Sequence, residues 1–173
     1  MMQATRQPTA PLQLLQADYT DAGHMAALVS LLDAYACDSA GGGEGLSDFA
    51  KANLPAALRA RANLFSVLAF DVSTGSVPVG LVNCVEGFST FACQPLVNVH
   101  DVVVLASHRG QRIAQQMFGL VEQIARQRGA CKLTLEVLSG NAPAVTLYRR
   151  LGFDNYQLDP AMGHAQFMQK WLA

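Results

Sequence analysis

The feature of this sequence that most constrains its fold is a buried strand that runs through a glycine-containing turn into a long helix. Residues 102–105 are all apolar, and the turn after them carries Arg109, Gly110 and Arg112. The following segment, to Gln127, has its apolar residues at helical spacing. They are Ile113, Met117, Leu120, Val121 and Ile124. A strand that leads into an amphipathic helix is typical of an α/β fold.

Hydrophobic periodicity and turn residues predict the other elements. We expect strands at residues 12–19, 64–70, 77–85, 96–105 and 132–138, and two closing strands near 153–158 and 166–172. We expect helices at 21–36, 110–127 and 141–151, and one or two short helices within 47–62, with Pro55 in a first turn. Gly129 suits the left-handed position after a helix, and Gly152 ends the last helix. This order predicts one α/β domain, residues 1–173, with a mixed, mostly antiparallel sheet and helices on both faces.

Length and charge narrow the functional classes. The 173 residues fit a single domain, with residues 1–11 as a flexible leader that lacks the apolar region of a signal peptide. A net charge of -1 and a charged fraction of 14% give no reason to expect nucleic-acid or membrane binding. The four cysteines and four histidines lack metal-ligand spacing, so we expect no metal site. Reduced thiols in a cytoplasmic protein explain the cysteines most simply.

The turn after the central strand is a candidate anion site. Exposed N–H groups and the helix dipole attract an anion at a helix N-terminus. Gly110 permits close backbone approach, and Arg109 and Arg112 can form charge-assisted hydrogen bonds with phosphate. The turn lacks the Gly-Lys-Ser/Thr of a Walker loop and the three spaced glycines of a Rossmann turn. A solvated edge with basic residues is the alternative interpretation of this motif alone.

A second motif lies at residues 141–153. Asn141 can cap the expected helix, and Asn141, Ala144 and Tyr148 are spaced so that they share one helix face. Ala144 leaves room on this face, and Tyr148 presents a phenol there. A capped amphipathic helix with a core tyrosine is the alternative explanation of these residues.

Together, the two motifs resemble those of the GNAT acetyltransferase superfamily. Arg109 to Ala114 resemble its acyl-CoA pyrophosphate loop, and Asn141-x-x-Ala144-x-x-x-Tyr148-x-x-x-Gly152-Phe153 resembles its second signature. The likeness extends from about residue 64 to the C-terminus. It implies that acetyl-CoA is the cosubstrate. The residues that it implies for binding acetyl-CoA are Val102, Val103, Val104, Arg109, Gly110, Gln111, Arg112, Ile113, Ala114, Gln115, Asn141, Ala144 and Tyr148.

Two local details refine the resemblance. The superfamily usually has glycine or alanine where this chain has Arg112, whose side chain can either crowd the pyrophosphate or pair with a phosphate of CoA. Residues 88–91, Phe-Ser-Thr-Phe, and the pair His100-Asp101 are similar to the diamine and thialysine acetyltransferase branch. That branch has two acidic residues where this chain has His100 and Asp101.

The chemistry implied is direct attack of a neutral amine on the thioester. The resemblance implies that Tyr148 is the general acid that protonates the departing thiolate, while a backbone N–H near residues 103–104 polarises the carbonyl. His100 and Asp101 are candidates for the base, and Glu136 is a third. On a regular strand His100 would share a face with residues 102 and 104, and Asp101 with residues 99 and 103, unless a bulge intervenes. A structural hydrogen bond is the alternative role for each.

The acceptor is less determined than the cofactor. Acidic residues outnumber basic ones through residue 60, and a slightly acidic rim would attract a cationic amine. The glycine-rich loop at residues 38–45 can serve as a lid, and Phe88 and Phe91 can line a pocket or the core. We therefore expect an N-acetyltransferase that acts on a small-molecule amine. A homodimer is one possible assembly. The alternatives are a protein or peptide N-acetyltransferase and a non-catalytic acyl-CoA-binding module.

Overall fold

One five-stranded sheet organises the chain. The computed structural model describes residues 11–38, 41–73, 75–159, 161, 163 and 165–172. The strands follow the order β1 (Leu12–Gln16), β2 (Leu64–Asp71), β3 (Val77–Ser89), β4 (Gln94–Val104) and β5 (Leu133–Leu135). Strands β1 to β4 are antiparallel neighbours, and β5 is parallel to β4. The predicted mixed, mostly antiparallel sheet is confirmed.

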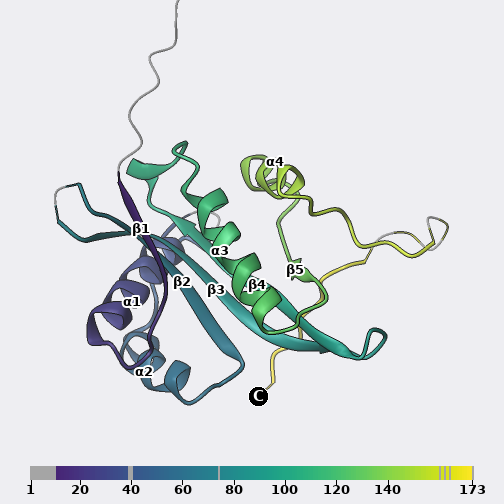
Figure 1. Cartoon of the computed structure of the whole chain (residues 1–173), viewed down its shortest axis with the longest axis horizontal. Helices are drawn as coiled ribbons and strands as arrows, with labels where there is room; N and C mark the ends of the chain where they lie inside the picture. The colour runs from purple at the N-terminus through teal and green to yellow at the C-terminus, as the bar shows by residue number, and fades with distance from the viewer. Residues whose placement is uncertain are drawn as a thin grey trace, which may run out of the picture.

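Helices cover both faces of this sheet, as predicted (Figure 1). Helices α1 (Ala22–Ala36) and α2 (Asp48–Arg59) lie on one face, and α3 (Ile113–Gln127) crosses the other. Helix α4 (Ala142–Arg150) lies on the α3 side, and its residue Tyr148 packs against the core beneath α3. A short 3₁₀ turn, η1 (Ala106–His108), leads from β4 toward α3.

Each face has its own hydrophobic core. The apolar stripe predicted for α3 packs on β2, β3 and β4, with Met117, Phe118 and Val121 fully buried. On the other face, Leu28 and Leu31 of α1 pack against strand residues that include Leu68, Leu81 and Val103. Burial of a Leu or Phe side chain contributes about 1.5–3 kcal/mol, so these two layers hold the sheet between the helices.

The helix ends follow the sequence signals closely. Asp21 caps α1 by accepting a hydrogen bond from the His24 N–H, and Ser47 caps α2 by accepting one from the Ala50 N–H. Within residues 47–62 there is one helix, α2, which contains Pro55 in its interior, so the expectation of a first-turn proline is wrong. The helix continues because proline removes only one N–H bond and the rest of the helix is well capped.

The glycine-rich loop between α1 and α2 is anchored at its C-terminal end. The Asp33 carboxylate accepts a hydrogen bond from the Leu46 N–H at 2.8 Å and pairs with Lys51 Nζ at 2.9 Å. Gly41 is required by packing, because a Cβ there would lie 2.0 Å from the Tyr35 carbonyl oxygen. Two of the loop's residues, 39 and 40, lie outside the described part of the chain, as do residues 1–10 of the expected leader. The lid function remains a prediction.

The end of the sheet differs from the sequence prediction. Strand β5 is three residues long instead of seven, and the described residues from 153 onward form no strand, so the two closing strands are wrong. Alternating apolar residues give a segment strand propensity, but a strand forms only where a sheet edge pairs with it. In this structure the segment instead leaves large apolar side chains in solvent, including those of Leu158, Phe167 and Trp171.

Strands β3 and β4 continue past their predicted ends into a hairpin. Phe88 is 59% exposed and Phe91 103% exposed near its turn. The expected position in the core is therefore wrong, and the pocket-wall alternative remains a prediction. Hydrogen bonding between the two long strands extends the pair beyond the helices, where no core remains to cover the aromatic rings.

Candidate active site

Strands β4 and β5 separate about halfway along β4. They pair only at Val97 with Leu133, Asn98 with Thr134 and Val99 with Leu135. Beyond this point no strand of the described chain lies on the outer side of β4. An unpaired strand edge presents backbone N–H and C=O groups to a ligand. Val102, Val103 and Val104, which the sequence assigned to the cofactor site, all lie on this open edge.

A β-bulge lies where the two strands separate. Asn83 of β3 faces Asp101, while the next residue, Cys84, faces Val99. His100 is thus the extra residue of the bulge. Bulges re-aim side chains and often lie next to active sites. The sequence left open whether a bulge interrupts β4 at the two base candidates, His100 and Asp101. The structure shows that it does.

The bulge changes which residues share a face. Val99 belongs to the core under α3 and Val103 to the core under α1, so the prediction that Asp101 shares a face with both is wrong. Side chains alternate between the two faces of a strand. Asp101 lies two residues before Val103 and therefore shares its face, the α1 face. His100 directly follows Val99, which faces α3, and therefore also lies on the α1 face. The prediction that His100 shares a face with residues 102 and 104 fails for the same reason, since these pack on the α3 side.

Asp101 has two neighbours on the α1 face. The Asn83 side-chain amide donates a hydrogen bond to Asp101 Oδ2 at 3.0 Å. The second neighbour is Tyr35, near the end of α1. Burial raises the pKa of its phenol, and the negative charges of the Asp101 and Asp38 carboxylates raise this pKa further. The sequence analysis missed Tyr35. Its only signal was an aromatic residue at the end of a predicted helix, just before a glycine run.

Glu136, the third base candidate, lies just past the end of β5. The side-chain amide of Asn98 contacts both Glu136 carboxylate oxygens at 3.2 Å and Thr134 Oγ1 at 3.2 Å. Asn98 therefore joins the two strands at the point where they begin to separate. The Glu136 side chain is exposed and already has a structural partner there.

The turn before α3 has the backbone conformation expected of an anion site. Gly110 has φ +79°, and Arg112, at the N-cap of α3, is also left-handed with φ 61°. The first helical hydrogen bond runs from the Gln116 N–H to the Arg112 carbonyl oxygen. The N–H groups that precede it, those of residues 113–115, therefore have no partner within the helix. Ile113 is buried in the core under α3, which fixes the direction of this first turn.

Arg109 is held by two protein groups. Its Nε donates to the Val104 carbonyl oxygen at 3.0 Å, and its Nη2 pairs with Asp38 Oδ2 at 2.8 Å. Asp38 belongs to the segment after α1, so the ion pair joins that segment to the turn before α3. Of the two arginines assigned to phosphate, Arg109 thus already has a carboxylate partner, and Arg112 is exposed beside the open helix end.

The second motif has a structural basis at both ends of α4. Asn141 accepts a hydrogen bond from the Ala144 N–H at 3.3 Å, which confirms the predicted cap. At the other end Gly152 has φ +90°, and the Phe153 N–H donates to the Tyr148 carbonyl oxygen at 3.0 Å. This is the Schellman arrangement, in which the residue after the glycine folds back on the helix. The Phe153 ring accordingly lies 6.0 Å from the Tyr148 ring.

Tyr148 is held in an aromatic cluster. Its ring lies 5.7 Å from that of Phe118 in α3, in addition to the contact with Phe153. Burial raises the pKa of the Tyr148 phenol to about 12, and Tyr35 contributes in the same direction. The phenol is therefore neutral at physiological pH and can donate a hydrogen bond. The effect of Tyr35 also shows that Tyr148 and the α1 side of the gap lie within electrostatic reach of each other.

Comparison with known proteins identifies the family. Residues 18–153 match the acetyltransferase (GNAT) family. The chain belongs to the GNAT family. This GNAT chain is 37% identical over 89 residues to streptothricin acetyltransferase of Streptomyces lavendulae. The match covers 50% of the chain and 47% of that relative, so the chain spans about half the length of the curated relative.

Solved structures share the fold. A structure described as a probable acetyltransferase superposes with a TM-score of 0.76 at 19% identity, covering 93% of this chain and 99% of that one. The aminoglycoside N-acetyltransferase AAC(6′)-Iy, in a complex with CoA, superposes with a TM-score of 0.70 at 17% identity, covering 95% and 98%. At these identities the likeness establishes the GNAT fold alone.

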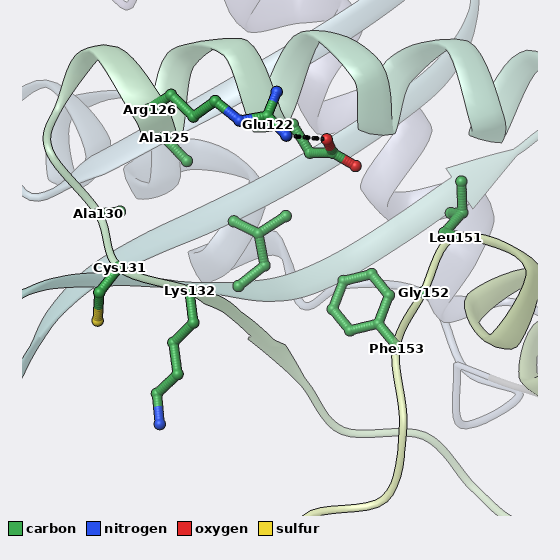
Figure 2. Close-up of a pocket in the computed structure, with 10 residues that line it drawn as sticks. Glu122, Ala125, Arg126, Ala130, Cys131, Lys132, Leu151, Gly152 and Phe153 are labelled. Carbon is green, nitrogen blue, oxygen red and sulfur yellow. Dashed lines mark hydrogen bonds and ion pairs between the residues drawn. The ribbon is translucent and has the colours of Figure 1, made fainter.

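A separate cavity of about 270 Å³ lies at the other end of α3 (Figure 2). Glu122 and Arg126 of α3 line one side, and residues 130–133 and 151–153 line the rest. Figure 2 shows the Phe153 ring beside this cavity. Because Glu122 lies nine residues along α3 from Ile113, about 14 Å separates this cavity from the turn before α3. None of the residues assigned to acetyl-CoA or to catalysis lines it.

The structure thus brings most of the predicted site residues around the gap between β4 and β5. The part of β4 that has separated from β5 contains His100, Asp101 and residues 102–104. From the end of β4, η1 leads to the turn before α3. Tyr148 of α4 packs on the same face of the sheet as Val102 and Val104. Helix α1 also contributes to this region through Tyr35, which was not predicted from the sequence.

Proposed function

We propose that this GNAT chain transfers the acetyl group of acetyl-CoA to a primary amine of a small molecule. The observation that carries the proposal is the gap between β4 and β5, because one place combines an open strand edge, a helix N-terminus with basic residues, and polar side chains at a bulge. The relative that matches half of the chain is named for acetylation of streptothricin. This name supports a small-molecule acceptor.

Acetyl-CoA fits the groups around the gap. Its pantetheine arm is peptide-like and can pair with the open edge of β4 at residues 102–104. The left-handed Gly110 and the N–H groups of the first turn of α3 suit its pyrophosphate. Arg112 adds a positive charge beside that helix end, and Gln111 and Gln115 flank it. Ala144 leaves the adjacent face of α4 open up to Tyr148.

The proposed reaction transfers one acetyl group and one proton. The neutral amine attacks the thioester carbonyl carbon, the new C–N bond forms, and the C–S bond breaks. The amine nitrogen gives up a proton to a base, the CoA thiolate receives one from the Tyr148 hydroxyl, and the proton released by the base returns through solvent to the Tyr148 phenolate. Because its pKa is raised to about 12, Tyr148 gives up its proton less readily than an ordinary phenol. Its main contribution is then a strong hydrogen bond to the forming thiolate.

We assign the acceptor amine to the α1 face of the gap, beside Asp101 and His100. A carboxylate attracts the cationic form of an amine, and either side chain can then accept its proton, directly or through water. Asp101→Asn and His100→Gln separate the two roles. Loss of the residue that accepts the proton lowers kcat and changes the pH–rate profile, whereas loss of a residue that only binds the amine raises KM.

The deciding experiment has two parts. Calorimetric titration with acetyl-CoA measures binding, and a panel of amines that ranges from polyamines and amino acids to aminoglycosides, streptothricin and peptides is assayed by thiol release. We expect binding, and turnover with small amines. Turnover with peptides alone favours a protein N-acetyltransferase, and binding without turnover favours a non-catalytic module. Absence of acetyl-CoA binding at high concentration overturns the proposal.

Tyr148→Phe is the matched control for the chemical step. The phenyl ring keeps the contacts with Phe118 and Phe153 but removes the hydroxyl. We expect turnover to fall by roughly 10²-fold or more, with nearly unchanged affinity for acetyl-CoA. Unchanged turnover would show that another group protonates the thiolate.

Assembly and location complete the proposal. We infer a homodimer, because the C-terminal segment exposes Phe167 and Trp171 and exposed apolar groups favour association. Light scattering during size-exclusion chromatography tests this inference. A cytoplasmic location is consistent with the four free cysteines. No helix within the described residues is long and apolar enough to cross a bilayer.

A further inference from the structure

A row of polar side chains crosses the α1 face of the sheet and ends at Asp101. The Tyr19 hydroxyl lies 2.8 Å from Ser66 Oγ, and Ser66 Oγ donates to Asn83 Oδ1 at 2.6 Å. Asn83 Nδ2 then donates to Asp101 Oδ2 at 3.0 Å. Ser66, Asn83 and Asp101 lie on the adjacent strands β2, β3 and β4, which run side by side in Figure 1. We call Tyr19, Ser66 and Asn83 the donor row.

The direction of every hydrogen bond in the donor row follows from its end at Asp101. A carboxylate only accepts, so the amide nitrogen of Asn83 must face Asp101 and its oxygen must face Ser66. Ser66 has one hydroxyl proton, which it gives to Asn83, and its oxygen is left to accept. Tyr19 must therefore donate to Ser66. Three donors in sequence point toward a single carboxylate oxygen.

The donor row lies in an environment where polar groups are costly. Ser66 is 0% exposed and is the only polar residue among the buried ones of the described chain. It lies between the apolar neighbours Phe65 and Val67 on β2. Burial raises the pKa of the Tyr19 phenol, which keeps this end of the row protonated and able to donate. A row of this kind is tolerated because every buried side-chain polar atom in the described residues has a partner.

Ser66 departs from the apolar pattern of its strand. Residues 65 and 67–70 of β2 are all apolar and buried, and they are fully compatible with the sheet. The polar row that begins in this apolar layer ends at Asp101, where it meets the site between β4 and β5.

We propose that the donor row positions Asp101 to receive the acceptor amine. The inference rests on the proposed function and deepens it by assigning residues that hold the acceptor side of that site. Because Asn83 holds Oδ2, the carboxylate cannot rotate freely, and we assign Oδ1 to the acceptor. An ammonium or amine group then meets one oxygen in one orientation. Asn83 and Ser66 are positioning residues, since they act through Asp101.

The first test removes the contact between Asn83 and Asp101. Asn83→Leu is nearly isosteric but cannot donate, so Asp101 loses its orientation. We expect KM for the amine to rise about tenfold, as for loss of one hydrogen bond to a charged group, with the dissociation constant of acetyl-CoA unchanged. Tyr19→Phe, which removes only the outermost donor, should produce a smaller rise and provides a mild variant if Asn83→Leu folds poorly.

The second test exchanges the two residues. In the double variant Asn83→Asp/Asp101→Asn, Ser66 and the new amide on β4 both donate to the carboxylate on β3, so every hydrogen bond of the row is retained. The carboxylate, however, moves to the neighbouring strand, about 4.8 Å away, and both of its oxygens are occupied. We expect thermal stability near that of the natural protein and a KM for the amine raised at least tenfold.

The outcomes separate this inference from the function on which it rests. If the natural protein acetylates an amine but Asn83→Leu leaves KM for that amine unchanged, the inference is wrong and the proposed function stands. The same holds if the exchanged variant has the natural KM, because a purely structural row would be satisfied in either arrangement. A natural protein that acetylates no amine overturns both. A raised KM in both variants, with acetyl-CoA affinity retained, supports the inference.

Discussion

At the residue scale, the phenol of Tyr148 links stability to alkaline pH. Burial raises its pKa from 10.0 to about 12, so the folded protein holds this proton more tightly than the unfolded chain. The stabilisation is fully present below pH 10 and is lost as the pH rises toward 12. We expect Tyr148→Phe to lose less stability than the natural protein over this range in urea unfolding. The buried groups Cys84, Tyr19 and Tyr35, whose pKa values are also raised, titrate in both proteins. Parallel losses in the two proteins would contradict the assignment to Tyr148.

Arg112 combines backbone strain with charge. Its φ of 61° lies in the left-handed region, which costs a non-glycine residue about 1–2 kcal/mol. We expect Arg112→Gly to unfold at a temperature raised by a few degrees, since relief of strain exceeds the added freedom of the unfolded chain. The same change removes a cation from the helix end, so we expect weaker binding of acetyl-CoA at low salt. Thermal unfolding and calorimetry measure the two effects.

Arg112→Lys separates charge from conformation. Lysine keeps the cation and the same left-handed strain, so its unfolding temperature and its affinity for acetyl-CoA should both stay near those of the natural protein. Tighter binding by Arg112→Gly than by either cationic form would show that the side chain crowds the pyrophosphate instead of pairing with it.

Individual residues of the site were predictable where the signal was local. The cap at Asn141, the left-handed turn at Gly129 and the end of the last helix before Gly152 depend only on neighbours along the chain, and each is confirmed. The faces of His100 and Asp101 were not, because one inserted residue in the β3–β4 pairing reverses the alternation. The hydrogen bonds from Tyr19 to Asp101 join residues 47, 17 and 18 positions apart, and a sequence carries no sign of such pairings.

At the element scale, the ion pair between Asp38 and Arg109 joins the segment after α1 to the turn before α3. A carboxylate on Arg109 competes with a phosphate for the same guanidinium. We expect Asp38→Asn to bind acetyl-CoA about two- to fivefold more tightly, which is the scale of an exposed ion pair. The difference should shrink as salt is added, because the attraction is screened. Calorimetric titrations at low and high salt measure it.

Glu44→Gln is the matched control for that experiment. It removes the same charge from the same loop, and its side chain is exposed and forms no ion pair in the described structure. An equal gain in affinity from both variants would mean that net charge, and not the release of Arg109, is responsible. Weaker binding by Asp38→Asn would instead indicate that the ion pair holds Arg109 in a position that favours phosphate.

Among the elements, helices and inner strands were more predictable than the end of the sheet. The α3 helix and the β2–β3 hairpin could be predicted from hydrophobic periodicity, because burial determines which residues along each element are apolar. The C-terminal segment carries the same kind of apolar pattern, yet its described residues pair with no strand. Pairing depends on which edge is free and how near it lies, and β5 offers an edge of only three residues.

At the scale of the whole molecule, the proposed acetyl-CoA site joins elements that otherwise meet only through the core. The open edge of β4, the first turn of α3 and the free face of α4 belong to different parts of the chain, and a ligand that contacts all three adds a connection between them. Acetyl-CoA at about 100 times its dissociation constant should stabilise the fold by about 2.7 kcal/mol. For a chain of this length this corresponds to a rise of roughly 5–10 °C in Tm.

The location of the added protection decides whether this site is the one occupied. We expect hydrogen exchange to slow at residues 102–104 and in the first turn of α3, and to change little in α2, which lies on the far side of the sheet. Tyr148→Phe should show the same Tm rise, since its hydroxyl acts in the chemical step, whereas Arg112→Gly should show a smaller one at equal ligand concentration. Protection centred instead on the cavity at residues 130–133 would place the ligand at the other end of α3, and the pyrophosphate assignment would then be wrong.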